Sequence, residues 1–155
     1  MKFVIQRVTR GSVSILSKET GEWYDKDSIE KGFVVLVGIA QEDTKEIADK
    51  MISKLIGLRI FEDSEGKTNL NLESVGGELL LVSQFTLYAD CKHGNRPGFT
   101  GAGKPDIASP LFDYIVEECR KRVKNVGCGV FGADMRIDMV NDGPFTIILD
   151  SDELK

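Results

Sequence analysis

Hydroxyl and amide side chains interrupt an apolar segment at Ser83-Gln84-Phe85-Thr86, immediately before a long loop. A serine or threonine hydroxyl attacks a carbonyl when a neighbouring base takes its proton, so Ser83 and Thr86 are candidate nucleophiles. The chain has one histidine, His93, and no GxSxG sequence, so a Ser-His-Asp triad finds little support. Buried hydroxyls and amides also need partners, and hydrogen bonds to the neighbouring backbone are the alternative role for these residues.

The loop that follows, Cys91–Lys104, combines glycines with local positive charge from Lys92, Arg96 and Lys104. Glycine permits a ligand to approach the backbone closely, and an aromatic ring such as that of Phe99 can stack on a nucleic-acid base. The sequence therefore indicates either a binding loop or an ordinary flexible surface loop.

A third segment, Asn141-Asp142-Gly143-Pro144, has the composition of a tight turn between strands. Most X-Pro bonds are trans, and only about 5–6% of them are cis in folded proteins. A cis Gly143-Pro144 bond would orient backbone carbonyls in a way that side chains cannot.

Composition excludes several classes of protein. The 155 residues carry 20 Lys and Arg against 25 Asp and Glu, a net charge of −5, which disfavours a globally basic nucleic-acid binder. The three cysteines have no CxxC spacing, and neither HExxH nor DxDxDG occurs, so no metal and no cofactor is expected. We expect neither a membrane span nor a signal peptide, and the cysteine pattern fits the cytoplasm.

The elements that must position these residues are mostly strands. Apolar or alternating segments predict strands at Phe3–Val8, Ser12–Leu16, Gly32–Ala40, Leu58–Phe61, Glu78–Tyr88, Gly127–Phe131, Asp134–Val140 and Phe145–Leu149. A turn at Thr9-Arg10-Gly11 would make the first two a hairpin, and Ser17–Lys31 would form a loop or irregular hairpin. Alternation along Glu78–Tyr88 places Gln84 and Thr86 on one face of that strand and Ser83 and Phe85 on the other.

Two helices complete the predicted fold. The first spans Asp43–Gly57 with Asp43 as its cap, and the second begins at Ser109 with Pro110 in the first helical position. We therefore expect one domain over residues 1–155, α/β in class with α+β as the alternative, built from mainly antiparallel or mixed strands.

Taken together, these segments resemble the D-aminoacyl-tRNA deacylase family, also called the D-tyrosyl-tRNA deacylase family. The matching pieces run in family order over almost the whole chain: VIQRV (Val4–Val8), LRIFEDSEGK (Leu58–Lys67), VSQFTLYAD (Val82–Asp90), GNRPGF (Gly94–Phe99), GVFGADM (Gly129–Met135) and NDGPFT (Asn141–Thr146). The chain departs from the family at Gly98, where Ser is usual, and at Phe145, where Val is common.

The resemblance implies an enzyme that hydrolyses the ester bond of D-aminoacyl-tRNA, in a homodimer with active sites at the subunit interface. It implies a pocket lined by Ser83, Gln84, Phe85, Thr86 and Leu87, and a cis Gly143-Pro144 pair inserted from the other subunit. It further implies that Arg7 supports that pair, and that the loop residues Arg96, Pro97, Gly98 and Phe99 hold the terminal adenosine. The expected partners are tRNA and a second copy of the chain, with no DNA and no membrane.

The implied chemistry needs little from side chains, because an aminoacyl ester is already activated. Backbone N–H groups near Phe85 and Thr86 would stabilise the oxyanion, and the 2′-hydroxyl of the terminal adenosine would activate water. Carbonyls of Gly143 and Pro144 would hold the ammonium of a D-substrate and collide with an L side chain, so glycine mischarged on tRNA is an expected further substrate. Two alternatives stay open: an esterase with Thr86 as nucleophile, and a non-catalytic RNA-binding module.

Overall fold

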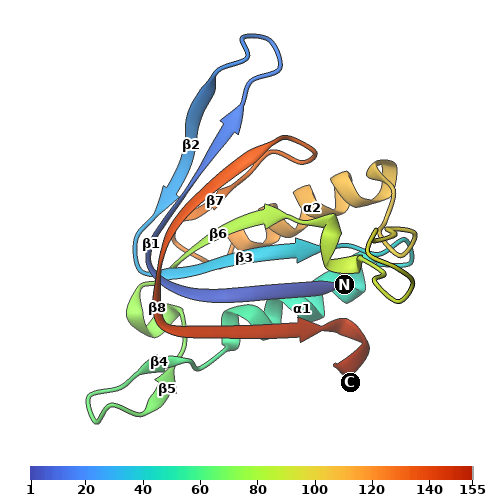
Figure 1. Ribbon diagram of the computed structural model, residues 1–155. Coiled ribbons are helices and arrows are strands. Elements are labelled where there is room, and N and C mark those ends of the chain that lie inside the picture. Colours follow the sequence, from blue (N-terminus) through green and yellow to red (C-terminus); the bar gives the residue numbers. More distant parts are fainter. Residues whose placement is uncertain (155) are drawn as a thin grey trace.

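One long strand, β1 (Lys2–Leu16), organises the sheet in the computed structural model, which describes residues 1–154. It pairs with β2 (Trp23–Ile29), β3 (Gly32–Gly38) and β8 (Met135–Asp150), all antiparallel. Next to β3, β6 (Glu78–Ser83) and β7 (Val126–Cys128) continue the sheet in parallel. The order is β2-β1-β3-β6-β7, with β8 on the other side of β1 (Figure 1).

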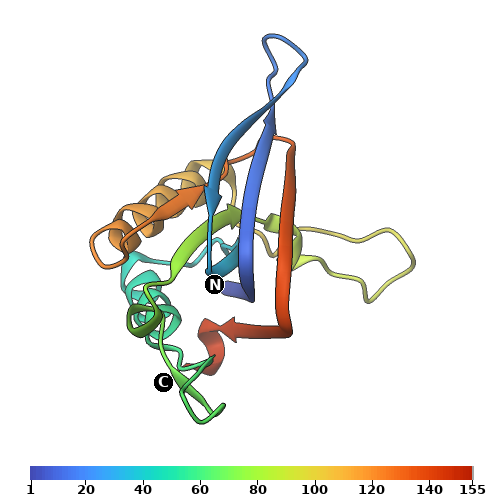
Figure 2. The same ribbon diagram turned by 90° about the vertical axis from the view of Figure 1, so that its left-hand side faces the viewer.

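Two helices lie on the same side of this sheet, as Figure 2 shows. They are α1 (Lys45–Gly57) and α2 (Pro105–Arg120). A two-stranded sheet, β4 (Phe61–Glu62) with β5 (Thr68–Leu70), and 3-10 helices at Glu73–Val75, Phe85–Tyr88 and Ser151–Glu153 complete the described chain. The prediction of a mixed α/β fold with two principal helices is confirmed.

The sheet has an apolar core on each face. The larger core lies between the sheet and the helices and contains Phe3, Phe33, Met51 and Phe112. The smaller core lies on the other face, where Val13, Val34, Leu80 and Val82 meet side chains of β8 as the sheet curls toward a barrel.

Two predicted turns are wrong, because the chain continues through each of them as strand. At Thr9-Arg10-Gly11, β1 does not reverse: Arg10 pairs with Val140, and Gly11 pairs with both Met139 and Ile29. At Asn141–Pro144, β8 likewise continues, and the register against β1 shifts between Gln6 and Val8. Pairing outweighs local turn propensity: β1 has a strand on each side at Gly11, and β8 pairs with β1 before and after the Asn141–Pro144 segment. The surplus residues of β8 form a bulge.

Both predicted helix caps are also wrong. The first helix is capped by Thr44, whose side chain accepts from the backbone N–H of Ile47, while Asp43 accepts from the N–H of Ala40 at 2.7 Å instead. The second helix begins earlier than predicted, with Pro105 at its start and Pro110 inside its first turns. Proline is favoured in the first turn of a helix, and both Pro105 and Pro110 could mark that turn. The sequence pattern alone does not distinguish between them.

Other boundaries moved by a few residues. The buried strand predicted at Gly32–Ala40 is confirmed but ends at Gly38. Of the two alternatives for Ser17–Lys31, the irregular hairpin is the one observed, because β2 in this segment pairs with β1 across a register shift. The strand predicted at Glu78–Tyr88 ends at Ser83. In residues 1–154, no helix combines the length and the apolar character that crossing a membrane requires.

Candidate functional site

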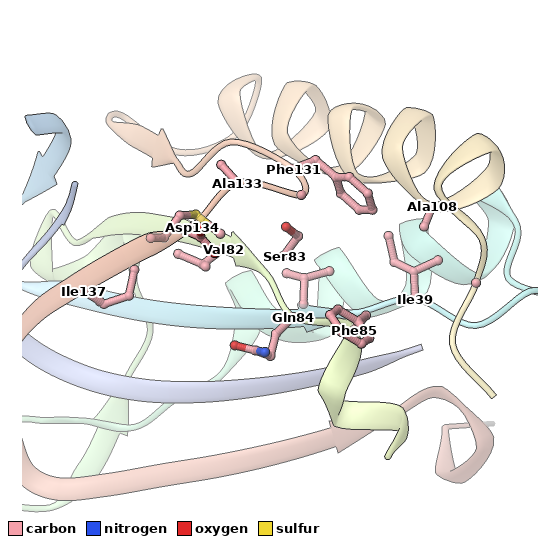
Figure 3. A pocket seen from close by; sticks show the side chains of 14 residues that line it. Ile39, Val82, Ser83, Gln84, Phe85, Ala108, Phe131, Ala133, Asp134 and Ile137 are labelled. Carbon is pink, nitrogen blue, oxygen red and sulfur yellow. The ribbon is translucent and has the colours of Figure 1, made fainter. Parts of the chain in front are cut away.

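A cavity of about 340 Å³ opens where β6 ends. Val82, Ser83, Gln84 and Phe85 form one wall, and Phe131–Met135, the segment after β7, forms the other (Figure 3). Its remaining lining comes from Val37, Ile39, Gly103, Ala108 and Ile137. The cavity is thus built on the carboxyl ends of the parallel pair β3 and β6, a common position for ligand sites.

The chain turns sharply at the mouth of this cavity. After Ser83, residues Phe85–Tyr88 form a 3-10 helix, so the strand alternation predicted for Ser83–Thr86 does not apply. Gln84 and Thr86 still meet, because the Gln84 Nε2 group donates to Thr86 Oγ1 at 2.5 Å. Ser83, Gln84 and Phe85 line the cavity, whereas Thr86 and Leu87 lie outside its lining.

The same turn leaves backbone donors free. The first N–H groups of a helix have no partner within it. Accordingly, the N–H groups of Phe85 and Thr86 donate to no backbone or side-chain acceptor in residues 1–154, while the next one, from Leu87, bonds to the carbonyl of Gln84 at 3.3 Å. Two adjacent free N–H groups at a cavity mouth can stabilise an anionic oxygen.

In residues 1–154, neither the Ser83 nor the Thr86 hydroxyl is hydrogen-bonded to a side chain that could act as its base. The Thr86 hydroxyl accepts its hydrogen bond from an amide, which cannot remove a proton. His93 lies in the exposed loop and does not line the cavity. Across residues 1–154, no group of three or more His, Cys, Asp or Glu side chains could hold a metal.

The glycine-rich loop reaches the site at Gly103, which lines the cavity, and at Phe99. Phe99 packs edge-on against Phe85 with 5.0 Å between ring centroids, and both rings are partly exposed. The base of the loop is closed by two backbone bonds between Asp90 and Gly98, at 2.7 and 2.9 Å. Arg96, Pro97 and Gly98 are exposed and stay outside the cavity lining.

The Gly143-Pro144 pair and Arg7, also predicted to belong to the site, form a separate cluster where β8 pairs with β1. The Gly143-Pro144 bond is cis, and neither residue lines the cavity of its own chain. Arg7, only 7% exposed, holds this segment: its Nε donates to the carbonyl of Asp142 at 3.0 Å and its Nη1 to that of Ile60 at 2.6 Å. The guanidinium also lies over the ring of Phe145, at 4.8 Å.

The wall formed by Phe131–Met135 was not assigned to the site from the sequence. Its only signal was the GVFGADM match, which carried no role, because small and apolar side chains suggest no chemistry. Among residues 1–154, Asp134 is the one ionisable residue in the cavity lining. Outside the cavity lining, at the end of the 3-10 helix, burial and the carboxylate of Asp43 raise the pKa of Tyr88, so this phenol stays protonated at neutral pH.

Comparison with known proteins gives one family and two informative structures. A family model described as D-Tyr-tRNA(Tyr) deacylase matches residues 4–150. A solved structure of a c-Myc DNA unwinding element binding protein is 39% identical, with a TM-score of 0.86 over 97% of this chain and 98% of that one. A probable eukaryotic D-amino acid tRNA deacylase is 18% identical, with a TM-score of 0.79 over 96% and 97% of the two chains, a likeness of fold.

Proposed function

Because this chain belongs to the D-Tyr-tRNA(Tyr) deacylase family and is a D-aminoacyl-tRNA deacylase, we propose that it cleaves the aminoacyl ester in the cavity at the end of β6. The observation that carries this assignment is the pair of free N–H groups at Phe85 and Thr86, beside a cavity where, within residues 1–154, no hydroxyl is hydrogen-bonded to a base. Such a site suits an activated ester, which needs charge stabilisation more than a strong nucleophile.

In the proposed reaction, water adds to the ester carbonyl and the N–H groups of Phe85 and Thr86 hold the developing oxyanion. The neighbouring 2′-hydroxyl of the terminal adenosine relays the proton of the attacking water. The bond between the carbonyl carbon and the ribose 3′-oxygen then breaks, and that oxygen takes a proton. The products are the free D-amino acid and tRNA. Phe85 and Phe99 offer aromatic surface on which the terminal adenine can stack.

We propose that chirality is selected across a dimer. The Gly143-Pro144 segment of one copy would enter the cavity of the other, so that its carbonyls hold the substrate ammonium and exclude an L side chain. A glycyl ester lacks the excluded side chain and would also be hydrolysed.

An apolar row on the open face of the sheet supports the dimer. Ile148 pairs with Val4, Val4 with Leu36, and Leu36 with Val82, so the four lie side by side across β8, β1, β3 and β6. Ile148 is 68% exposed, and Val4 and Leu36 are only half-buried. A second copy related by a two-fold axis would cover this row and bring each β8 toward the other cavity.

Incubation with D- and L-tyrosyl-tRNA tests the function. We expect release of D-tyrosine but not of L-tyrosine. In the cell, we expect this activity in the cytoplasm, where charged tRNA is found. Absence of D-tyrosine release would contradict the assignment. Because the 39% identical relative is named for DNA binding, duplex DNA is included as a competitor, and inhibition at low concentration would favour a second, DNA-binding function.

Replacing Thr86 separates the two catalytic alternatives. We expect Thr86→Val to retain kcat within about threefold, because its backbone N–H remains. If Thr86 were the nucleophile, kcat would fall by about 10⁴-fold or more. Single-turnover hydrolysis of D-tyrosyl-tRNA measures the difference, and trapping of an acyl-enzyme would support the nucleophile.

Asp134 is expected to attract the substrate ammonium. Removing its charge with Asp134→Asn should raise KM about fivefold at low salt, since an exposed charge pair is worth about 1 kcal/mol. Asp138→Asn is the control, because Asp138 lies four residues further along the chain, in β8, is 70% exposed and does not line the cavity. An equal change in KM for both variants would contradict a local role for Asp134.

A further inference from the structure

The curled sheet is closed along one seam by side chains rather than by a strand ladder. The strands β2 and β7 end the sheet on its two sides and lie next to each other (Figures 1 and 2). Within residues 1–154 no ladder pairs them. Instead, the Lys26 Nζ group donates to the carbonyl of Cys128 at 2.7 Å, and the N–H of Cys128 donates to Asp27 Oδ2 at 2.9 Å.

Each of the two hydrogen bonds to the Cys128 backbone has one charged partner, the Lys26 ammonium or the Asp27 carboxylate. Lys26 and Asp27 also pair with each other at 3.0 Å. Burial opposes ionisation of each, but their hydrogen bonds leave the pKa of Lys26 raised and the pKa of Asp27 lowered, so both are charged at neutral pH. Hydrogen bonds with one ionised partner are about twice as strong as neutral ones.

The approach of the two strands also depends on Gly127. A Cβ on Gly127 would lie 2.8 Å from the Cβ of Asp27, closer than side chains allow. The seam is therefore a close-fitting contact in which two side chains of β2 bond both polar groups of the Cys128 backbone.

Cys128 is the point from which the chain enters the cavity wall. The next N–H, from Gly129, bonds to the carbonyl of Leu81 at 3.0 Å, and the chain then forms the wall at Phe131–Met135. At the far end of the wall, the N–H of Leu16 bonds to the carbonyl of Asp134, also at 3.0 Å. The β1–β2 hairpin thus holds the wall at both ends.

We propose that Lys26 and Asp27 are positioning residues for the deacylase reaction, which fix the Phe131–Met135 wall through the backbone of Cys128. This inference rests on the proposed function, because it assumes that the cavity receives the aminoacyl end of tRNA. The wall faces the substrate, whereas the oxyanion donors lie on the opposite wall. Loss of the seam therefore weakens substrate binding more than it slows the chemical step.

Lys26→Met and Asp27→Ala test the proposal. We expect each to raise KM for D-tyrosyl-tRNA about tenfold, with kcat per folded enzyme within about twofold, because uniform binding is lost. Lys26→Arg keeps a charged donor and should restore most of the affinity. A purely structural role would reduce the amount of folded enzyme without changing KM, so an unchanged KM in both variants overturns the proposal.

Ser14→Ala is the matched control. The Ser14 hydroxyl donates to Asp25 Oδ1 at 2.8 Å, a bond between β1 and β2 that does not involve β7. An equal rise in KM for this variant overturns the proposal. Hydrogen exchange is a second readout that needs no activity: the amides of Gly129 and Ala133 should exchange faster in Lys26→Met than in Ser14→Ala. Equal exchange also overturns it, whereas an inactive wild type would instead contradict the proposed function.

Discussion

Gly143→Ala is expected to lower kcat/KM for D-tyrosyl-tRNA by about 100-fold, because a misplacement of about 1 Å at a positioning group costs this much. Gly143 has φ +129°, which side chains rarely adopt, and an added Cβ would lie 2.9 Å from the N of Phe145 and 3.2 Å from Arg7 Nη2. The segment must therefore move, and the carbonyls that we propose for chiral selection move with it. Steady-state hydrolysis of the D- and L-esters measures the loss.

Gly21→Ala provides a control with the same kind of backbone cost. Gly21 has φ +70° at the turn between β1 and β2, and nothing lies within 4 Å of its added Cβ. We expect this variant to lose some stability but little activity. Comparable activity losses in the two variants, or full activity of Gly143→Ala, would contradict the role of the Gly143-Pro144 segment.

Subunit mixing shows whether that segment acts across a dimer. Ser83→Leu fills the cavity but leaves Gly143-Pro144 intact, whereas Gly143→Ala does the reverse. Each variant alone should retain about a hundredth of the wild-type activity or less. After co-refolding, half of the dimers contain both variants and each has one complete site, so about a quarter of the wild-type activity should return. No recovery, together with a monomeric mass by light scattering, would exclude a site shared between subunits.

The sequence was most informative where a local pattern and its tertiary partners agree. The run at Gly32–Gly38 is apolar throughout because β3 lies between β1 and β6 and is buried at every position except Leu36. The helical spacing of Met51, Ile52 and Leu55 likewise marks the face that α1 buries. In both elements the sequence period matches the observed burial, so strand and helix could be predicted without tertiary information.

The wrong turn predictions lie where pairing with strands distant in sequence decides the path of the backbone. Gly11 and the Asn141–Pro144 segment look like turns, but whether a strand reverses depends on the neighbours that pair with it, and β1 and β8 support each other over most of their length. The site shows the same division. Ser83 and Gln84 were predicted from their polar side chains and Phe85 from the family resemblance, and all three line the cavity. The free N–H groups and the Phe131–Met135 wall are properties of the backbone path, which side-chain types do not encode.

Arg7 is the second position with a large expected effect. Arg7→Met keeps the length of the side chain but removes the donors to the carbonyls of Ile60 and Asp142. An unsatisfied buried acceptor costs about 1–3 kcal/mol, so the free energy of unfolding should fall by about 2–4 kcal/mol. Urea denaturation followed by circular dichroism measures this loss. Deacylation should fall as well, because Asp142 precedes the segment that we propose to enter the partner cavity.

Arg7→Lys distinguishes the charge of Arg7 from its geometry. Lysine retains the positive charge near the Asp142 carboxylate, which lies 3.6 Å from Arg7 Nε, but a single ammonium cannot reproduce the planar, forked donor set that spans two carbonyls. We therefore expect stability between those of the wild type and Arg7→Met, with chiral discrimination still impaired. If Arg7→Lys discriminated D- from L-tyrosyl-tRNA as well as the wild type does, the two-carbonyl geometry would not matter, and the charge alone would account for the support that Arg7 gives to Gly143-Pro144.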